Sequence, residues 1–250
     1  ANLAKAARQV ANGSFGNGGQ LCVSLSRIYV PNAVKAEFER EFVEVAQGLK
    51  VGRSNDFSFD IGTLTSAAQL ARVERFLTDA LAKGARLLTG GKQLAEVGPY
   101  FFEPTVLTDI PEAAEIYREE VFGPVISVYG YETVDDAINA ANDSVYGLNA
   151  AVFGNEREAK KVAARLEAGS VNINEGYRAT FASFDAPMGG FKQSGQGRRG
   201  GIGGLLRFTE ARTVAVSKTY LGIGLPNNAK QWKKMAPLMD RLASVLRRLP

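Results

Sequence analysis

The chain's one cysteine, Cys22, follows a glycine-rich turn with the sequence Phe15-Gly16-Asn17-Gly18-Gly19-Gln20-Leu21. Glycine adopts backbone angles closed to other residues and lets backbone N–H groups approach a ligand closely. A thiol beside such donors has what a nucleophile needs to attack a carbonyl and to stabilise the resulting oxyanion. The alternative is that Cys22 is inert, because lone cysteines commonly pack as small buried hydrophobes.

The sequence contains no histidine, and this limits the chemistry open to the chain. Cysteine proteases and serine hydrolases of the triad type need an imidazole base, so this chain alone fits neither class. A general base must be a carboxylate, a lysine, a tyrosine or a group supplied by another segment. One cysteine cannot form an intrachain disulfide, and without histidine it predicts no metal site.

The composition is that of a soluble globular protein, with 45% hydrophobic and 22% charged residues in a chain of 250. No apolar run approaches the roughly 20 residues that cross a bilayer, and no secretion signal is visible, so we expect a cytoplasmic protein without a membrane span. The net charge of +4 comes from residues 227–250, where six lysines and arginines face one aspartate. The remaining chain has no basic excess, and we expect no nucleic-acid partner.

Strands and helices alternate along the chain. Residue patterns predict strands at 27–30, 86–89, 105–107, 125–129, 150–153 and 170–173, with helices at the start and at about 38–49, 67–83, 134–142 and 159–166. This order is typical of parallel strands joined by helical crossovers, so we expect an α/β fold with a mostly parallel sheet and flanking helices. Active sites in such folds lie at the carboxyl ends of the strands.

The last third of the chain is less regular. Residues 174–204 lack a clear period, which favours a functional loop. Within them Gly195-x-Gly197-x-x-Gly200 matches the dinucleotide fingerprint, but no strand precedes it, and we interpret the match as accidental. Residues 213–218 predict an edge strand that pairs with another subunit. From Asn228 the pattern predicts a basic amphipathic helix, which lies on a membrane or partner, or packs on this protein or a sister subunit.

Five blocks of sequence occur in a distinctive order: Gly19-Gln20-Leu21-Cys22, Glu119-Glu120-Val121-Phe122-Gly123-Pro124, Asn142-Asp143-Ser144-Val145-Tyr146-Gly147-Leu148, Gly169-Ser170-Val171-Asn172-Ile173-Asn174, and Gly189-Gly190-Phe191-Lys192-Gln193-Ser194-Gly195. In this order and spacing, over about residues 1–218, they resemble the aldehyde dehydrogenase family. The resemblance implies a catalytic domain at 1–205, a C-terminal oligomerisation arm at 206–226 and a basic tail helix at 227–250.

The resemblance also implies a mechanism and the residues that perform it. The Cys22 thiolate would add to an aldehyde, the oxyanion would be held partly by the Cys22 N–H, and hydride would leave to NAD or NADP. Glu120 would accept hydrogen bonds from the nicotinamide ribose, which Gln69 would also reach, and Phe122 would pack beside the nicotinamide. Without the family, Glu120 is interpreted as a solvated carboxylate and Phe122 as a core ring.

Family members are oligomers, so the resemblance implies a homodimer or homotetramer in which residues 213–218 extend a neighbour's sheet. In the family the general-base glutamate, the oxyanion asparagine and the phosphate-binding half of the nucleotide domain all lie upstream of the helix with which this sequence opens. We therefore expect the chain to be a fragment that has little dehydrogenase turnover alone.

Within the family, the blocks Asn174-Glu175-Gly176-Tyr177 and Ala186-Pro187-Met188-Gly189-Gly190, with the basic tail, are most similar to bacterial succinate-semialdehyde dehydrogenases of the second, NADP type. This implies succinic semialdehyde as the substrate. The arginine that usually lies six residues before the cysteine is Gly16 here, so Arg178 becomes the candidate that binds the substrate carboxylate. A less charged aldehyde is the alternative.

Two other functions remain open. Cys22 and its neighbouring amides could take an acyl group from an activated ester without any nucleotide, which would make the protein an esterase or acyl transferase. The chain could instead be a non-catalytic oligomerisation module in which Cys22 plays no part.

Overall fold

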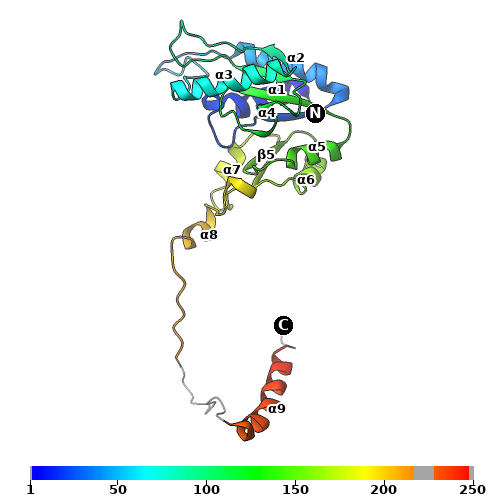
Figure 1. Ribbon diagram of the computed structural model, residues 1–250, viewed down its shortest axis with the longest axis vertical. Coiled ribbons are helices and arrows are strands. Elements are labelled where there is room, and N and C mark those ends of the chain that lie inside the picture. Colours follow the sequence, from blue (N-terminus) through cyan, green and yellow to red (C-terminus); the bar gives the residue numbers. More distant parts are fainter. Residues whose placement is uncertain (1, 217–227, 248–250) are drawn as a thin grey trace. The chain divides into compact units, whose positions relative to one another are not determined.

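The structure, a computed structural model, describes residues 2–216 and 228–247, which belong to two compact units (Figure 1). The larger unit is Ala1–Thr209 and the smaller is Glu210–Pro250. The larger unit carries Cys22 and all the strands of the described residues.

A four-stranded sheet lies at the centre of the larger unit. Its order is β1 (Arg27–Pro31), β4 (Val125–Tyr131), β3 (Thr105–Thr108) and β2 (Arg86–Thr89). β4 pairs in parallel with both β1 and β3, so the expected α/β fold with a mostly parallel sheet is confirmed. β2 departs from this, because it pairs with β3 in the antiparallel direction.

The strands do not all join one sheet. β5 (Asn149–Val152) and β6 (Ser170–Ile173) pair in parallel with each other and form a separate two-stranded sheet. The strand-helix alternation correctly predicted both strands and their direction. It did not predict that the described residues divide them between two sheets.

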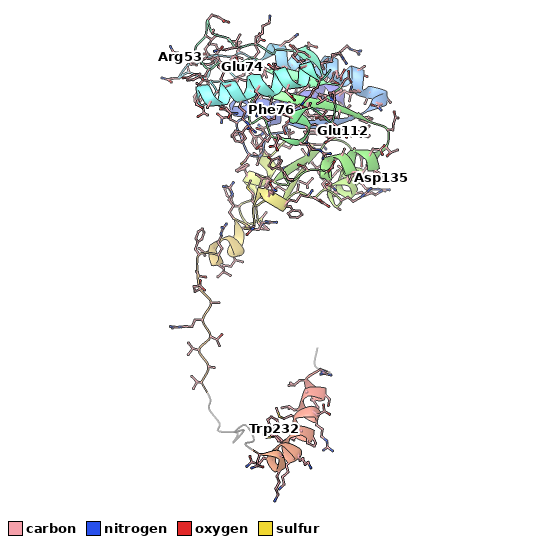
Figure 2. All side chains as sticks on the ribbon, in the orientation of Figure 1. Arg53, Glu74, Phe76, Glu112, Asp135 and Trp232 are labelled. Atoms are coloured by element: carbon pink, nitrogen blue, oxygen red, sulfur yellow. The ribbon has the colours of Figure 1, made fainter. Side chains whose placement is uncertain are left out.

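Alternate side chains of the central sheet enter two hydrophobic cores, as expected for a sheet covered by helices on both faces. Val106 and Ile126 enter the core under α1 (Leu3–Phe15) and α2 (Asn32–Gly48). Leu107 and Val125 enter the core under α3 (Ala67–Ala82) and α4 (Glu115–Arg118). Figure 2 labels Phe76 on α3, a ring that is completely buried in this second core.

Two further helices connect the last strands, with α5 (Val134–Asn142) after β4 and α6 (Glu156–Ala163) after β5. α5 begins at a capping box in which Thr133 and Asp136 exchange hydrogen bonds, and α6 begins at Asn155, whose side chain accepts from two backbone N–H groups. α5 is attached to β1, because the Tyr29 hydroxyl donates to the Ala140 carbonyl at 3.1 Å.

The segment expected to be an irregular loop, 174–204, contains short regular pieces. They are α7 (Arg178–Ala182), the 3-10 turn Lys192–Ser194 and the first residues of α8 (Gly201–Leu206). The glycine fingerprint at 195–200 follows the 3-10 turn and not a strand, which agrees with its interpretation as accidental.

The smaller unit contains the predicted tail helix, α9 (Ala229–Leu246), which is capped by Asn228. Its Trp232 is exposed (Figure 2), as are Met239 and Leu242. Among the described residues no helix is long and apolar enough to span a bilayer. Residues 213–216 of the predicted edge strand form no strand here, and residues 217 and 218 lie outside the described residues. Pairing of this segment with another subunit stays a prediction.

Candidate active site

Cys22 is exposed because the chain turns sharply after α1. The helix ends at the buried ring of Phe15 and is followed by the 3-10 turn Gly16–Gly19, in which Asn17, Gly18 and Gly19 have φ angles of 53°, 64° and 70°. These left-handed angles favour glycine and reverse the chain within a few residues. The Cys22 thiol is free and exposed, so it is not the inert core side chain of the alternative interpretation.

The turn before Cys22 packs directly against the loop that carries Glu120 and Phe122. A Cβ atom at Gly19 would overlap the carbonyl oxygen of Gly123 and lie 2.6 Å from its carbonyl carbon. Only a residue without a side chain allows two backbones to approach so closely. Two sequence blocks about a hundred residues apart therefore meet backbone to backbone.

Gln20 attaches the same turn to a third segment. Its side-chain Nε2 donates to the Thr63 carbonyl at 3.2 Å, and its Oε1 accepts from the Thr65 N–H at 2.9 Å. The side chain of Gln20 is thus a structural brace between the cysteine turn and the residues that precede α3.

A large groove of about 1320 Å³ opens in front of the thiol. Cys22 and Ser24 line it together with Glu119, Glu120 and Tyr146. The structure thus brings the predicted nucleophile and the predicted ribose-binding carboxylate to one groove. Phe122 and Gln69 are not among the residues that line it.

The backbone N–H of Cys22 is unused within the part of the chain that the structure describes. The neighbouring N–H groups of Gln20 and Ser24 donate to the carbonyls of Asn17 and Leu21, whereas no hydrogen bond from the Cys22 N–H is found there. A free donor beside the nucleophilic sulfur is what an oxyanion formed at that sulfur requires.

Side chains of α3 hold the loop of Glu120 from behind. Arg72 Nη2 donates to the Glu120 carbonyl at 2.5 Å, and Gln69 Nε2 donates to the carbonyls of Val121 and Phe122 at 3.0 and 2.7 Å. We call this pair of side chains the α3 clamp. The clamp accompanies an unusual backbone, because Phe122 has a φ of 57°.

The α3 clamp changes the interpretation of Gln69. The family resemblance implied that Gln69 contacts the nicotinamide ribose, and the structure places its amide on two backbone carbonyls. Arg72 was not predicted. Its position three residues after Gln69, on the same face of a predicted helix, is the signal that could have identified it.

The Glu120 carboxylate is half-buried and makes no hydrogen bond or ion pair with any residue between 2 and 216 or between 228 and 247. Burial raises its pKa, and the nearby Arg72 charge partly opposes this. A carboxylate that faces a groove and lacks a protein donor fits a ligand that supplies hydroxyl donors. The ribose of a nicotinamide dinucleotide is such a ligand, so this part of the groove fits that cofactor.

Arg178, the candidate for the substrate carboxylate, is not brought to this groove. Its guanidinium is largely exposed and pairs with Glu175, with Nε 3.0 Å from Oε1. Residue Asn149 was not predicted, yet it lines the groove and donates to the Val23 carbonyl at 2.9 Å, which fixes β5 beside the residue that follows Cys22.

The raised pKa of Glu120 predicts a pH-dependent stability. Because the folded-state pKa lies above the ordinary 4.5, the folded protein binds more protons than the unfolded chain between those two values. The wild-type protein should therefore lose stability relative to Glu120→Gln as the pH rises from 4.5 through the folded pKa, and the difference should then level off. Urea unfolding across this range measures it.

The matched control is Glu119→Gln, which removes a neighbouring exposed carboxylate. A wild-type protein that instead gains stability relative to Glu120→Gln as the pH rises would show that an opposite charge, and not burial, dominates at Glu120.

Comparison with known proteins adds a family to this geometry. The chain matches the aldehyde dehydrogenase family over residues 1–214. A Mycobacterium tuberculosis protein named as a succinate-semialdehyde dehydrogenase [NADP(+)] is 45% identical over 238 residues, which is 94% of this chain and 46% of that protein. The chain thus spans about half the length of the curated relatives it matches.

Solved structures give the same result. The crystal structure of an NAD-dependent aldehyde dehydrogenase from Sinorhizobium meliloti has a TM-score of 0.83 at 32% identity, covering 91% of this chain and 44% of that one. A betaine aldehyde dehydrogenase double mutant from Staphylococcus aureus, in complex with NAD+ and with a BME-modified cysteine, has a TM-score of 0.78 at 38% identity, covering 83% of this chain and 42% of that one.

Proposed function

The chain belongs to the aldehyde dehydrogenase family, and from that premise we propose that it supplies the nucleophile and part of the nucleotide site of an enzyme that oxidises an aldehyde to its acid with NAD(P)+. The observation that carries the proposal is the exposed Cys22 thiol, on a turn packed against Gly123, in the groove that Glu120 also lines.

Cys22 performs the covalent steps. Its Sγ bonds to the aldehyde carbon while the carbonyl π electrons move to oxygen, and the free Cys22 N–H donates to that oxygen. When bound, NAD(P)+ accepts the hydride that leaves this carbon. Cys22 then carries the acyl group as a thioester and departs as a thiolate when water attacks, which releases the acid. A thiolate suits both roles because it is a strong nucleophile and a good leaving group.

Glu120 orients the nucleotide. Its half-buried carboxylate accepts hydrogen bonds from the ribose hydroxyls, and the α3 clamp fixes the backbone on which it is mounted. Phe122 does not line the groove of Cys22 and Glu120, so the packing of its ring beside the nicotinamide stays a prediction from the family. In this assignment Gln69 and Arg72 are positioning residues, because their side chains act through the loop.

Glu120→Gln is expected to raise the KM for NAD(P)+ by roughly tenfold, because an amide is a weaker acceptor than a carboxylate. The KM for the aldehyde should change little. Steady-state kinetics of the protein isolated with any polypeptide that co-purifies, with each substrate varied in turn, measures both KM values. Glu119→Gln serves as the matched control. An equal rise in both KM values would mean that Glu120 supports the whole groove and does not bind the nucleotide.

For the substrate, we propose succinic semialdehyde, since relatives at 45% identity carry that activity in their names. The protein, isolated with any polypeptide that co-purifies, should form NAD(P)H from succinic semialdehyde at least about tenfold more efficiently than from butanal, because a bound carboxylate adds charge-assisted hydrogen bonds. Equal efficiency with the two aldehydes would show that the enzyme does not recognise the substrate carboxylate. If Arg178 binds that carboxylate, Arg178→Ala should abolish the preference for succinic semialdehyde.

A further inference from the structure

The helix α9 separates apolar from charged residues along its length. At about 3.6 residues per turn, its large apolar side chains share one side, which takes up roughly half of the circumference. The charged residues and Pro237 lie on the other side, so the proline does not interrupt the apolar one. We call the apolar side the α9 face, and its large exposed residues are Trp232, Leu238, Met239, Leu242, Val245 and Leu246.

The α9 face is open to solvent. No residue of α9 is buried, and Leu238, Leu242 and Leu246 are each more than half exposed. Single exposed leucines are ordinary, whereas a continuous apolar strip along about five turns of one helix is typical of a surface that binds something. The α9 face is therefore an interaction surface.

Cations lie along both borders of the α9 face. In projection down the helix axis, Lys234 is next to Val245 at one border, and Arg247 is next to Ala236 at the other. The long apolar stems of lysine and arginine let their charges reach outward from such a border. The charge comes from five cations, Lys230, Lys233, Lys234, Arg241 and Arg247, and Asp240 is the one acid among residues 228–247.

We propose that α9 binds the surface of a bilayer that contains anionic phospholipids. The α9 face enters the boundary between headgroups and acyl chains, and the cations at its borders contact the lipid phosphates. The helix lies in the plane of the surface, because it is not long and apolar enough to cross a bilayer. The inference concerns where the protein is held and does not rest on the proposed aldehyde chemistry.

Charge selects this occupant over a second copy or the larger unit. Two copies of α9 would each bring a net charge of about +4, and like charges repel. Residues 1–209 carry 22 lysines and arginines and 24 aspartates and glutamates, so the larger unit is almost neutral and attracts a basic helix little. An anionic bilayer offers many negative charges on a flat surface, which suits a face that covers half of a helix and has cations at both borders.

The fluorescence of Trp232 tests the proposal, because it is the chain's only tryptophan and lies on the α9 face (Figure 2). When vesicles of phosphatidylglycerol and phosphatidylcholine are added to the full chain, its emission should shift to shorter wavelength. Lipids brominated on the acyl chains should quench it, since the ring is expected about 5–10 Å into the boundary. Vesicle sedimentation measures the affinity.

The lipid charge should decide the affinity. Vesicles of phosphatidylcholine alone should bind at least about tenfold more weakly than the mixed vesicles at low salt, since each cation near an anionic surface contributes about a factor of five. Raising the salt to about 1 M should remove most of this difference, because exposed charges are then screened.

Leu242→Gln and Ser244→Gln form a matched pair on opposite sides of α9. Leu242→Gln should weaken binding to the mixed vesicles by at least about tenfold, because it removes a large apolar side chain from the α9 face, whereas Ser244→Gln should bind like the wild type. Lys234→Gln should weaken binding by about fivefold, and only where phosphatidylglycerol is present. Lys5→Gln, which removes an exposed charge from the larger unit, should change nothing. Circular dichroism confirms that the variants fold.

Three results would overturn the proposal: no binding to the mixed vesicles, equal binding to the two kinds of vesicle, or binding without a change in the Trp232 emission. Emission that is already at short wavelength without vesicles, and that vesicles leave unchanged, would assign the α9 face to a contact with protein. Failure of the protein isolated with any polypeptide that co-purifies to sediment with the mixed vesicles would also overturn it, because the face would then be covered in the assembly. None of these measurements is an enzyme activity, so the proposed function would stand or fall separately.

Discussion

Cys22→Ser is expected to abolish aldehyde oxidation, lowering kcat by roughly 10⁴-fold or more, as the loss of a covalent nucleophile does in other enzymes. The substitution keeps nearly the same shape on the same exposed turn. It replaces a strongly nucleophilic sulfur with a weakly nucleophilic hydroxyl oxygen, and a good leaving group with a poor one. NAD(P)H formation by the protein isolated with any polypeptide that co-purifies measures the turnover, and mass spectrometry of the trapped acyl-enzyme locates the thioester.

A relocated thiol provides the control. Ser24 lines the same groove two residues further along, but its Oγ is buried. Ser24→Cys in the Cys22→Ser background therefore restores a thiol near the groove without restoring the exposed sulfur beside the free Cys22 N–H. This double variant should stay inactive. Turnover of Cys22→Ser within about tenfold of the wild type would place the nucleophile elsewhere. Ester hydrolysis that proceeds without nucleotide and exceeds aldehyde oxidation would favour the acyl-transfer alternative.

Gly19→Ala is expected to cost at least about 3 kcal/mol of the free energy of unfolding, because a left-handed non-glycine residue and a backbone overlap are both unfavourable. The new Cβ would meet the carbonyl of Gly123, and neither backbone can move without displacing a site loop. Urea unfolding measures the loss. The rate at which Cys22 reacts with a thiol reagent should change too, because the cysteine turn must shift.

Gly18→Ala separates the two causes. Gly18 has a φ of 64°, close to the 70° of Gly19, but its Cβ would meet only the Gln20 side chain at 3.4 Å and Ile61 at 3.8 Å. Gly18→Ala should therefore lower the free energy of unfolding by only about 1–2 kcal/mol, which is the effect of the left-handed conformation alone. Equal losses at the two positions would show that the contact with Gly123 contributes nothing to stability.

Local patterns predicted the elements of the larger unit well. Strands β1 to β6 and the long helices follow from apolar periodicity and from prolines and glycines at their ends, signals that act over a few residues. The glycines before Cys22 correctly indicated a turn that exposes a side chain. Such signals are short-range, so a single sequence is enough to read them.

Local sequence patterns did not predict the contacts between segments that are far apart in the sequence. Nothing near Gly19 indicates that Gly123 lies against it, and nothing near Glu120 indicates that Gln69 and Arg72 hold its loop. The division of the strands into two sheets was missed because strand order gives direction but not adjacency. The roles of Cys22, Glu120 and Phe122 rest on the family, and the pairing of 213–218 stays a prediction.

The α3 clamp has a consequence for how tightly a nucleotide binds. Because α3 already fixes the carbonyls of Glu120, Val121 and the left-handed Phe122, this wall is rigid before any ligand arrives. Nucleotide binding then orders little additional backbone in this loop, so it loses little conformational entropy and the affinity is higher. The loop is ordered during folding, when the contacts with α3 offset the unfavourable left-handed backbone of Phe122.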